Sequence, residues 1–279
     1  MKPQAKPLTK PPAKPLAKQP PAKQPGQAKP LTKPTRKIAL LVGSNYPNTP
    51  YKLNGCLNDV QFMQDFLTKN YQYNQITTLT DNTSLKPTKQ NTLNAFTSML
   101  KNSQPGDIML FCYSGHGSNV FDSNKEEKDK RDEVLVCCDM QYIIDDELKA
   151  IVDQNMKPQT SLLCLFDSCY SGSAMDLQYQ IFDSDSRNFT TTNRNNKLTK
   201  GQVILISGCK DSQTSADAYI NSTSRGAMLW SFLQAMQSAP TTYRNLITTM
   251  RDLLKSNGYT QIPQLSAGRQ LNVDTNFIL

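Results

Sequence analysis

Two short motifs in this chain of 279 residues contain the residue types of cysteine-dependent acyl transfer. His116, the only histidine, stands in YSGHG directly after the apolar run IMLFC, and Cys169 stands in DSCYSG directly after LLCLF. A cysteine attacks a carbonyl carbon as its thiolate, and imidazole is the side chain that accepts a proton near neutral pH. An isolated histidine and an isolated cysteine are more often ordinary buried side chains, so the motifs must be placed on a fold.

In acyl transfer, His116 would take the thiol proton of Cys169 and later return it to the leaving amine. Glycines flank His116 and permit close approach of a substrate, and a backbone N–H near Gly117 or Cys169 would bind the oxyanion. Other cysteine chemistries fit less well. A phosphatase loop needs an arginine where Met175 stands, and the sequence has no CxxC pair and no GxxxxGK loop.

Alternating strand and helix patterns predict where these motifs lie. Apolar runs typical of buried strands occupy residues 37–43, 76–79, 107–113, 133–138, 161–166 and 203–206, with a last extended piece at 264–271. Helical spacing covers 58–71, 92–102, 145–154, 225–237 and 241–257, with Asp145 as a cap, and polar loops cover 119–132 and 184–200. This order predicts an α/β fold with a central, mainly parallel β-sheet flanked by helices on both faces. His116 and Cys169 then meet at one sheet edge, where such folds bind ligands.

The basic charge of the chain is concentrated at its beginning. The chain has 31 Lys and Arg against 23 Asp and Glu, and residues 1–37 contain ten of these basic residues, ten of the 17 prolines and no acidic residue. Because proline fixes φ and lysines repel one another, we predict that residues 1–36 form a disordered, Pro/Lys-rich extension that favours polyproline II. It is either a solvated leader or a segment that holds a polyanion, such as nucleic acid or an anionic membrane face.

The remaining residues, 37–279, are enough for one large domain. We expect a soluble protein, because the first 36 residues lack the apolar run of a signal peptide and the longest apolar runs are too short to cross a bilayer. The seven cysteines are odd in number and several lie in strand-like runs, which favours a reduced, cytoplasmic protein.

The motifs around both candidate residues, and others along the chain, resemble those of a metacaspase. The matching segments, in order, are KIALLVGSNY, LNGCLNDV, YSGHGS, DEVLVCCD, IIDDEL, LFDSCYSG, SGCKDSQTSADA and QIPQLSAG. The resemblance covers roughly Lys37 to Leu271 and implies a caspase-like fold with His116 and Cys169 as the catalytic dyad. Caspases also place the histidine about 50 residues before the cysteine, although their local signature around the cysteine is absent here.

The resemblance further implies an endopeptidase that cleaves after Arg or Lys. Asp59 and Asp167 match the acidic primary pocket of the family, with Cys56 and Ser114 beside them. Two carboxylates in a recess bind a guanidinium through charge-assisted hydrogen bonds and repel an aspartate side chain. From its position alone, Asp59 would rather be a helix cap.

Calcium is the expected activator, again by resemblance. The positions of the family's calcium site are matched by Asp132, Asp145, Asp146 and Asp176. Hard Ca²⁺ binds several carboxylate and carbonyl oxygens, and no EF-hand loop is present in the sequence. The alternative is that Asp145 caps a helix and the other three are solvated surface charges.

The family also implies a zymogen that cuts itself after basic residues. We therefore expect a large-subunit-like part at 37–183, a polar loop at 184–202 and a small-subunit-like part at 203–279. Candidate positions are Arg187, Arg194, Lys197 and Lys200 in the loop, and Arg36, Lys37, Lys18 and Lys23 near the extension, where no proline follows.

Two functions remain open at this stage. The first is a calcium-stimulated, monomeric cysteine endopeptidase that acts on protein or peptide substrates and on no specific nucleic acid. The second is a caspase-fold scaffold or aggregate-handling protein whose main role is binding, tethered by its basic extension.

Overall fold

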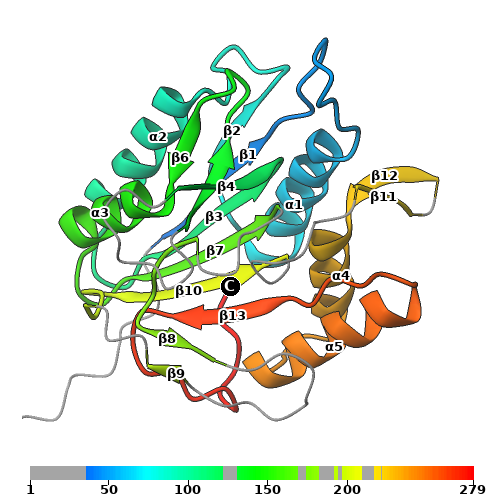
Figure 1. The fold of residues 1–279 in the computed structure, drawn as a ribbon. Helices are drawn as coiled ribbons and strands as arrows, with labels where there is room; N and C mark the ends of the chain where they lie inside the picture. Colours follow the sequence, from blue (N-terminus) through cyan, green and yellow to red (C-terminus); the bar gives the residue numbers. More distant parts are fainter. Residues whose placement is uncertain are drawn as a thin grey trace, which may run out of the picture. The chain divides into compact units, whose positions relative to one another are not determined.

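Leucine-, isoleucine- and valine-rich runs form the inner strands of a central eight-stranded sheet, as seen in the computed structural model of the protein (Figure 1). The structure describes residues 36–121, 131–168, 174–181, 192–193, 197–208, 217–220 and 222–279. The sheet order is β2 (Gln75–Thr80), β1 (Lys37–Gly43), β3 (Ile108–Ser114), β7 (Ser161–Asp167), β10 (Gln202–Ser207), β13 (Gln264–Ala267), β8 (Tyr179–Gln180) and β9 (Thr192–Asn193). The first five strands are parallel, and β13, β8 and β9 each pair antiparallel with the preceding strand in this order.

Helices cover both faces of this sheet (Figure 1). One face packs against α1 (Cys56–Tyr71), α4 (Ala227–Ala235) and α5 (Tyr243–Ser256), and the other packs against α2 (Lys89–Lys101) and α3 (Asp145–Asn155). A short 3₁₀ helix, η1 (Met236–Ser238), follows α4. Successive side chains of a strand point to opposite faces, so each central strand contributes to two separate cores.

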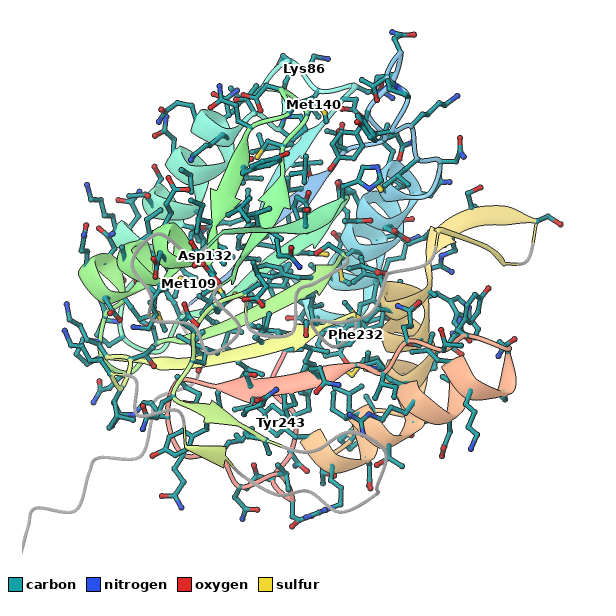
Figure 2. The ribbon with its side chains drawn as sticks, in the orientation of Figure 1. Lys86, Met109, Asp132, Met140, Phe232 and Tyr243 are labelled. Atoms are coloured by element: carbon teal, nitrogen blue, oxygen red, sulfur yellow. The ribbon has the colours of Figure 1, made fainter. Side chains whose placement is uncertain are left out.

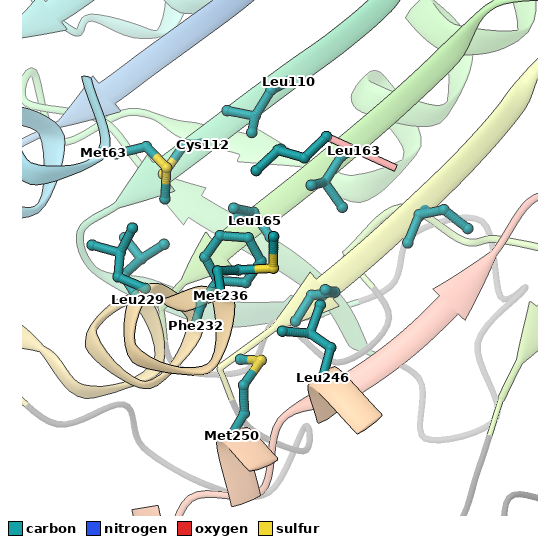
Figure 3. Packing of buried hydrophobic residues seen from close by; sticks show 14 of the residues in the cluster. Met63, Leu110, Cys112, Leu163, Leu165, Leu229, Phe232, Met236, Leu246 and Met250 are labelled. Carbon is teal, nitrogen blue, oxygen red and sulfur yellow. The ribbon is translucent and has the colours of Figure 1, made fainter. Parts of the chain in front are cut away.

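The division between the two cores is visible along β3. Leu110 and Cys112 belong to the core beneath α1, α4 and α5, whereas Met109 and Phe111 belong to the core beneath α2 and α3. Figure 3 shows the first core, where Phe232 of α4 lies among strand residues and side chains of α1 and α5. Burial on both faces explains why these strands read as continuous apolar runs.

Two small antiparallel sheets extend from this framework. β4 (Gly117–Phe121), β5 (Arg131–Val136) and β6 (Tyr142–Ile144) form one, and the hairpin of β11 (Asp217–Ile220) and β12 (Thr223–Gly226) forms the other. Asp132 of β5 is labelled in Figure 2, together with Phe232 of α4 and Tyr243 of α5. None of the helices in the described ranges is long and apolar enough to span a bilayer.

The predicted fold class is confirmed, and so are six of the eight strands of the central sheet (β2, β1, β3, β7, β10 and β13) and the five helices, with ends that shift by a few residues. The predicted loop at 119–132 is wrong at both ends, which belong to β4 and β5. The short strands β8, β9, β11 and β12 were not predicted, since a segment of two to four residues is too short to show a period.

The cap of α3 also differs from its prediction. Ile144 precedes the helix as its N-cap residue, and its N–H donates to Glu147 Oε2 over 3.0 Å. Asp145 is instead the first helical residue, and its Oδ2 accepts a 3.0 Å hydrogen bond from the backbone N–H of Glu133. The Asp145 side chain therefore ties α3 to β5.

Candidate active site

The candidate site lies where the order of the central sheet reverses. The chain runs from β1 to β2 on one side and then to β3 on the other side of β1, and α/β folds of this kind bind ligands at the carboxyl ends of the strands beside such a reversal. Ser114 at the end of β3 is in register with Asp167 at the end of β7, and Gly115 N–H donates to the Asp167 carbonyl over 3.3 Å. This pairing brings the YSGHG and DSCYSG motifs together at one edge.

His116 occupies this edge in a defined orientation. Its imidazole is half-buried, lies 4.7 Å from the ring of Tyr46 between centroids, and has Nε2 2.6 Å from the backbone carbonyl oxygen of Tyr51. A carbonyl oxygen only accepts hydrogen bonds, so this contact assigns the proton to Nε2. Nδ1 is left as the basic nitrogen of the neutral ring.

Cys169 lies outside the described residues and directly follows Ser168, the last described residue after β7. Its distance to His116 is therefore not defined, and the dyad stays a prediction. The predicted oxyanion donor Gly117 is the first residue of β4 and is paired with Leu135 of β5.

Two buried carboxylates lie behind this edge. Asp59, in the first turn of α1, is 1% exposed, and its Oδ2 accepts hydrogen bonds from Ser114 Oγ (2.8 Å) and Gly226 N–H (2.9 Å). Asp167 is 4% exposed, and its Oδ2 accepts one from Leu229 N–H over 2.8 Å. Asp59 is therefore not the helix cap, because the N-cap of α1 is Gly55.

The carboxylates of Asp59 and Asp167 converge on Gly226. A Cβ atom at this position would overlap Oδ2 of both residues, so only glycine fits between them. Burial raises the pKa of Asp59 well above its usual range, the nearby charge of Asp167 raises it further, and the hydrogen bonds from Ser114 and Gly226 oppose this shift. The structure thus brings together the predicted pocket residues Asp59, Ser114 and Asp167.

Cys56 and Arg225 complete the surroundings of Asp59. Cys56 is buried at the start of α1, and its N–H donates to Asn45 Oδ1 over 2.9 Å. Arg225 of β12 was not predicted: it is 8% exposed, with its guanidinium carbon 4.0 Å from the ring centroid of Phe62, one helical turn beyond Asp59. The charge of Arg225 lowers the pKa of Asp59. No sequence signal marks this residue, because β12 is too short to show a pattern.

Three of the four predicted calcium ligands form a cluster. Asp145, Asp146 and Asp176 each offer one carboxylate oxygen, and these oxygens lie within 4.8 Å of one another. Asp132 is buried on β5 and is not part of that group, although its charge contributes to raising the pKa of Asp145. Burial is the main cause of that shift, which brings the pKa of Asp145 to about 6. Three convergent carboxylates suit a hard cation such as Ca²⁺.

Comparison with known proteins identifies the family. The description "Metacaspase, peptidase C14 domain" matches residues 37–178. Metacaspase-1 of Scheffersomyces stipitis is 36% identical over 88% of this chain and 73% of its own length. The chain belongs to the metacaspase family. Metacaspase-1 of Schizosaccharomyces pombe is likewise 33% identical over 88% of this chain and 70% of its own length.

Solved structures agree on the fold. A crystallised protein of Geobacter sulfurreducens superposes with a TM-score of 0.65 at 24% identity, covering 86% of this metacaspase and 97% of that protein. Caspase-1 of Spodoptera frugiperda superposes with a TM-score of 0.55 at 10% identity, covering 85% and 88%. This metacaspase therefore has the caspase-like fold, and its family makes it a cysteine protease.

The predicted self-cleavage positions of this metacaspase differ in their surroundings. Lys37 is the first residue of β1, which lies between β2 and β3, and its Nζ donates to the Leu279 carbonyl over 2.8 Å. Arg36 forms a two-hydrogen-bond ion pair with Asp107 (3.3 and 2.5 Å). Both side chains are therefore held by the folded chain.

In the polar loop, Lys197 and Lys200 are both exposed, and Lys200 lies between the buried residues Thr199 and Gly201. The carbonyl before Lys200, that of Thr199, accepts a 2.6 Å hydrogen bond from Arg269. Arg187, Arg194, Lys18 and Lys23 lie outside the described residues.

Proposed function

We propose that this metacaspase is an endopeptidase that cleaves proteins after arginine or lysine, with His116 as the base and Cys169 as the nucleophile. The observation that carries the proposal is the buried pair Asp59 and Asp167, whose carboxylates converge beside the strand end that leads to His116. Two buried acids that both lie against one glycine favour the binding of a cationic group, because it offsets the repulsion between their charged forms.

The proposed reaction uses the tautomer described above. Nδ1 of His116 takes the Sγ proton of Cys169, and the thiolate attacks the carbonyl carbon of the scissile peptide bond. The imidazolium then returns the proton to the leaving amine as the C–N bond breaks, and water hydrolyses the acyl-enzyme. The Nε2 contact with the Tyr51 carbonyl holds the ring in this tautomer and in this orientation. A backbone N–H near Gly117 or Cys169 is the proposed oxyanion donor.

The acidic pair provides the proposed specificity. Asp59 Oδ1 is buried and has no hydrogen-bond partner among the described residues, so a substrate guanidinium or ammonium would supply its missing donor. Ser114 bonds the other oxygen of this carboxylate, and Cys56 lines the same helix start. A substrate aspartate would place a third carboxylate here and be repelled.

The test is hydrolysis of reporter peptides that end in Arg, Lys or Asp. We expect turnover of the Arg and Lys reporters alone, and its loss in Cys169→Ala and in His116→Ala. Asp59→Asn should raise KM for the Arg reporter at least about tenfold, because it removes one charge of the pair. Efficient cleavage of the Asp reporter would contradict the proposal.

We propose Ca²⁺ as the activator, bound by Asp145, Asp146 and Asp176, with Asp132 nearby. The bound ion would neutralise the mutual repulsion of these carboxylates. Asp145 connects this cluster to β5 through the Glu133 N–H, and β5 pairs with β4, the strand that begins next to His116. An ion that fixes the Asp145 side chain would thus also fix β5 and, through its backbone hydrogen bonds, the start of β4 next to His116.

We also propose that the protein is a cytoplasmic monomer and that it matures by cleaving itself in the polar loop, residues 184–202. β8 and β9 continue the sheet beyond β13, so the edge strand at that end is the two-residue β9. An edge this short offers little backbone for pairing with a second sheet, which supports the monomer.

A further inference from the structure

Two buried tyrosine hydroxyls hold the peptide groups of His116 from both sides. The hydroxyl of Tyr46 accepts a 2.9 Å hydrogen bond from the His116 N–H and donates to the Val136 carbonyl over 2.6 Å. The hydroxyl of Tyr113 lies 2.8 Å from the His116 carbonyl and 2.7 Å from that of Val136, either of which can accept its proton. The two hydroxyl oxygens are 3.1 Å apart.

The same position is tied to the neighbouring sheet. Val136 N–H donates to the His116 carbonyl over 2.9 Å, so this carbonyl is bound by both a tyrosine and a strand. The ring of Tyr46 also lies against the imidazole, at 4.7 Å between centroids. Tyr46 thus contacts both the main chain and the side chain of the proposed base.

Gly115 makes room for the two hydroxyls. A Cβ atom there would lie 2.6 Å from the Tyr113 hydroxyl and 2.7 Å from the Tyr46 hydroxyl, closer than real Cβ contacts. The glycine before His116 in YSGHG therefore has a structural reason that is separate from substrate approach.

The backbone of Tyr46 is strained in this position. Its φ is 48°, in the left-handed region that bulky residues rarely adopt. The preceding loop is fixed by Asp81, which accepts hydrogen bonds from Ser44 Oγ (2.8 Å) and Asn45 N–H (2.5 Å). Strain that the surroundings impose in this way is typical of functional sites.

Both hydroxyls keep their protons at neutral pH, as tyrosines ordinarily do, and burial raises the pKa of Tyr46 and of Tyr113 further. Each therefore remains a hydrogen-bond donor over the working range of a cysteine protease.

We propose that Tyr46 and Tyr113 form a tyrosine brace that holds His116 in the position of the general base, as positioning residues and not catalytic ones. This inference rests on the proposed function, in which His116 accepts the proton of Cys169. Displacing a general base by a fraction of an ångström lowers the rate of the chemical step more than it lowers substrate affinity.

The test compares Tyr46→Phe, Tyr113→Phe and the double variant with a matched control, Tyr73→Phe. Tyr73 is also buried, at 2% exposed, but its hydroxyl has no hydrogen-bond partner among the described residues. With the Arg reporter and enzyme concentration set by active-site titration, each brace variant should lose about tenfold in kcat, with KM changed less than about twofold. The double variant should lose about as much kcat as the less active of the two single variants, because both hydroxyls hold the same residue and their effects do not add. Tyr73→Phe should match wild type.

A second readout does not depend on activity. The chain has one histidine, so ¹³C-labelled imidazole gives one Cε1 signal, and its position reports the environment of His116. We expect this signal to move in both brace variants and to stay in Tyr73→Phe. If Tyr113→Phe does not fold, Tyr46→Phe alone tests the proposal, because the Tyr46 hydroxyl is the group that accepts the hydrogen bond from the His116 N–H.

Wild-type kcat and an unmoved imidazole signal in the brace variants would overturn the brace, even if their melting temperatures fell. Full activity of His116→Ala would instead overturn the proposed function. The two failures are therefore distinguishable.

Discussion

Gly226 shows how a single residue defines the candidate pocket. Its N–H donates to Asp59, and the absence of its side chain allows the carboxylates of Asp59 and Asp167 to approach each other. A pocket built in this way cannot accommodate an added side chain, because the buried ends of β3, β7 and α1 that surround it are closely packed.

Gly226→Ala should therefore remove activity on both Arg and Lys reporters. The added methyl group would displace the two carboxylates, and we expect kcat/KM to fall at least about 100-fold, with a loss of stability of about 1–3 kcal/mol from overpacking. Reporter hydrolysis and thermal melting measure the two effects. Gly258→Ala is the control: it places alanine at φ 80° but meets no atom within 4 Å, so its folded form should keep wild-type activity.

The acidic pair also predicts how ligand binding depends on pH. Since burial and Asp167 raise the pKa of Asp59, its carboxylate gains a proton as the pH falls, and a guanidinium then loses its partner. Affinity for agmatine, a guanidinium probe, should weaken by about tenfold per pH unit below the apparent pKa of the pair. Inhibition constants measured over a pH series in wild type and Asp59→Asn test this. An affinity that is flat, or that rises as the pH falls, would be inconsistent with the assignment.

At the scale of elements, the link between α3 and β5 connects the acidic cluster to the catalytic edge. Asp145 begins α3 and binds β5 through Glu133, and β5 pairs residue by residue with β4 from Gly117 onward. This arrangement gives the proposed calcium site a physical path to His116 that consists of ladder hydrogen bonds.

Calcium should accordingly stabilise the folded chain even without catalysis. In Cys169→Ala, Ca²⁺ at about 100 times its Kd should add about 2.7 kcal/mol to the free energy of unfolding. Differential scanning calorimetry with Ca²⁺, with Mg²⁺ and with chelator measures this. Asp146→Asn should lose most of the shift, and Asp252→Asn, an exposed aspartate on α5, should keep it. If Ca²⁺ stabilised Asp146→Asn as much as Asp252→Asn, the ion would have to bind at another site.

At the scale of the whole molecule, the fold decides which basic residues can act as cleavage sites. Lys37 lies in a strand paired on both sides and Arg36 is bound to Asp107, whereas Lys197 is exposed. A protease needs an extended, accessible segment, so residues within the central sheet are protected until it unfolds.

Mass mapping of wild-type protein should therefore find new N-termini within 184–202 and none at Lys37 or Ile38. Cys169→Ala should remain intact. Lys197→Gln and Lys200→Gln test the two exposed candidates one at a time: the variant at the cleaved position should lose the corresponding fragment, and the other variant should keep it. Fragments that begin at Ile38 would contradict the protection of Lys37 by the sheet, and fragments that persist in Cys169→Ala would contradict self-cleavage.

Sequence patterns alone determined the central sheet, the helices on its two faces and the strand ends that carry the two motifs. These features follow from local physics, because a strand buried on both faces must be apolar throughout and a covering helix must repeat its apolar residues every three to four positions. The motifs also identified the family and Asp59, Ser114 and Asp167 as neighbours. The short polar strands escaped prediction because pairing, not composition, creates them.

Only the tertiary structure decided what surrounds the lone histidine. The Tyr51 carbonyl that sets its tautomer and the Tyr46 hydroxyl that binds its N–H come from segments distant in the chain, as does Arg225 beside Asp59. Tyr113 stands in the same motif as His116, but its hydroxyl and that of Tyr46 meet only in the folded chain. Each contact depends on how strands and loops from separate parts of the sequence converge at one edge of the sheet. Sequence spacing specifies which residue types are present, whereas hydrogen-bond geometry and burial exist only once the sheet has formed.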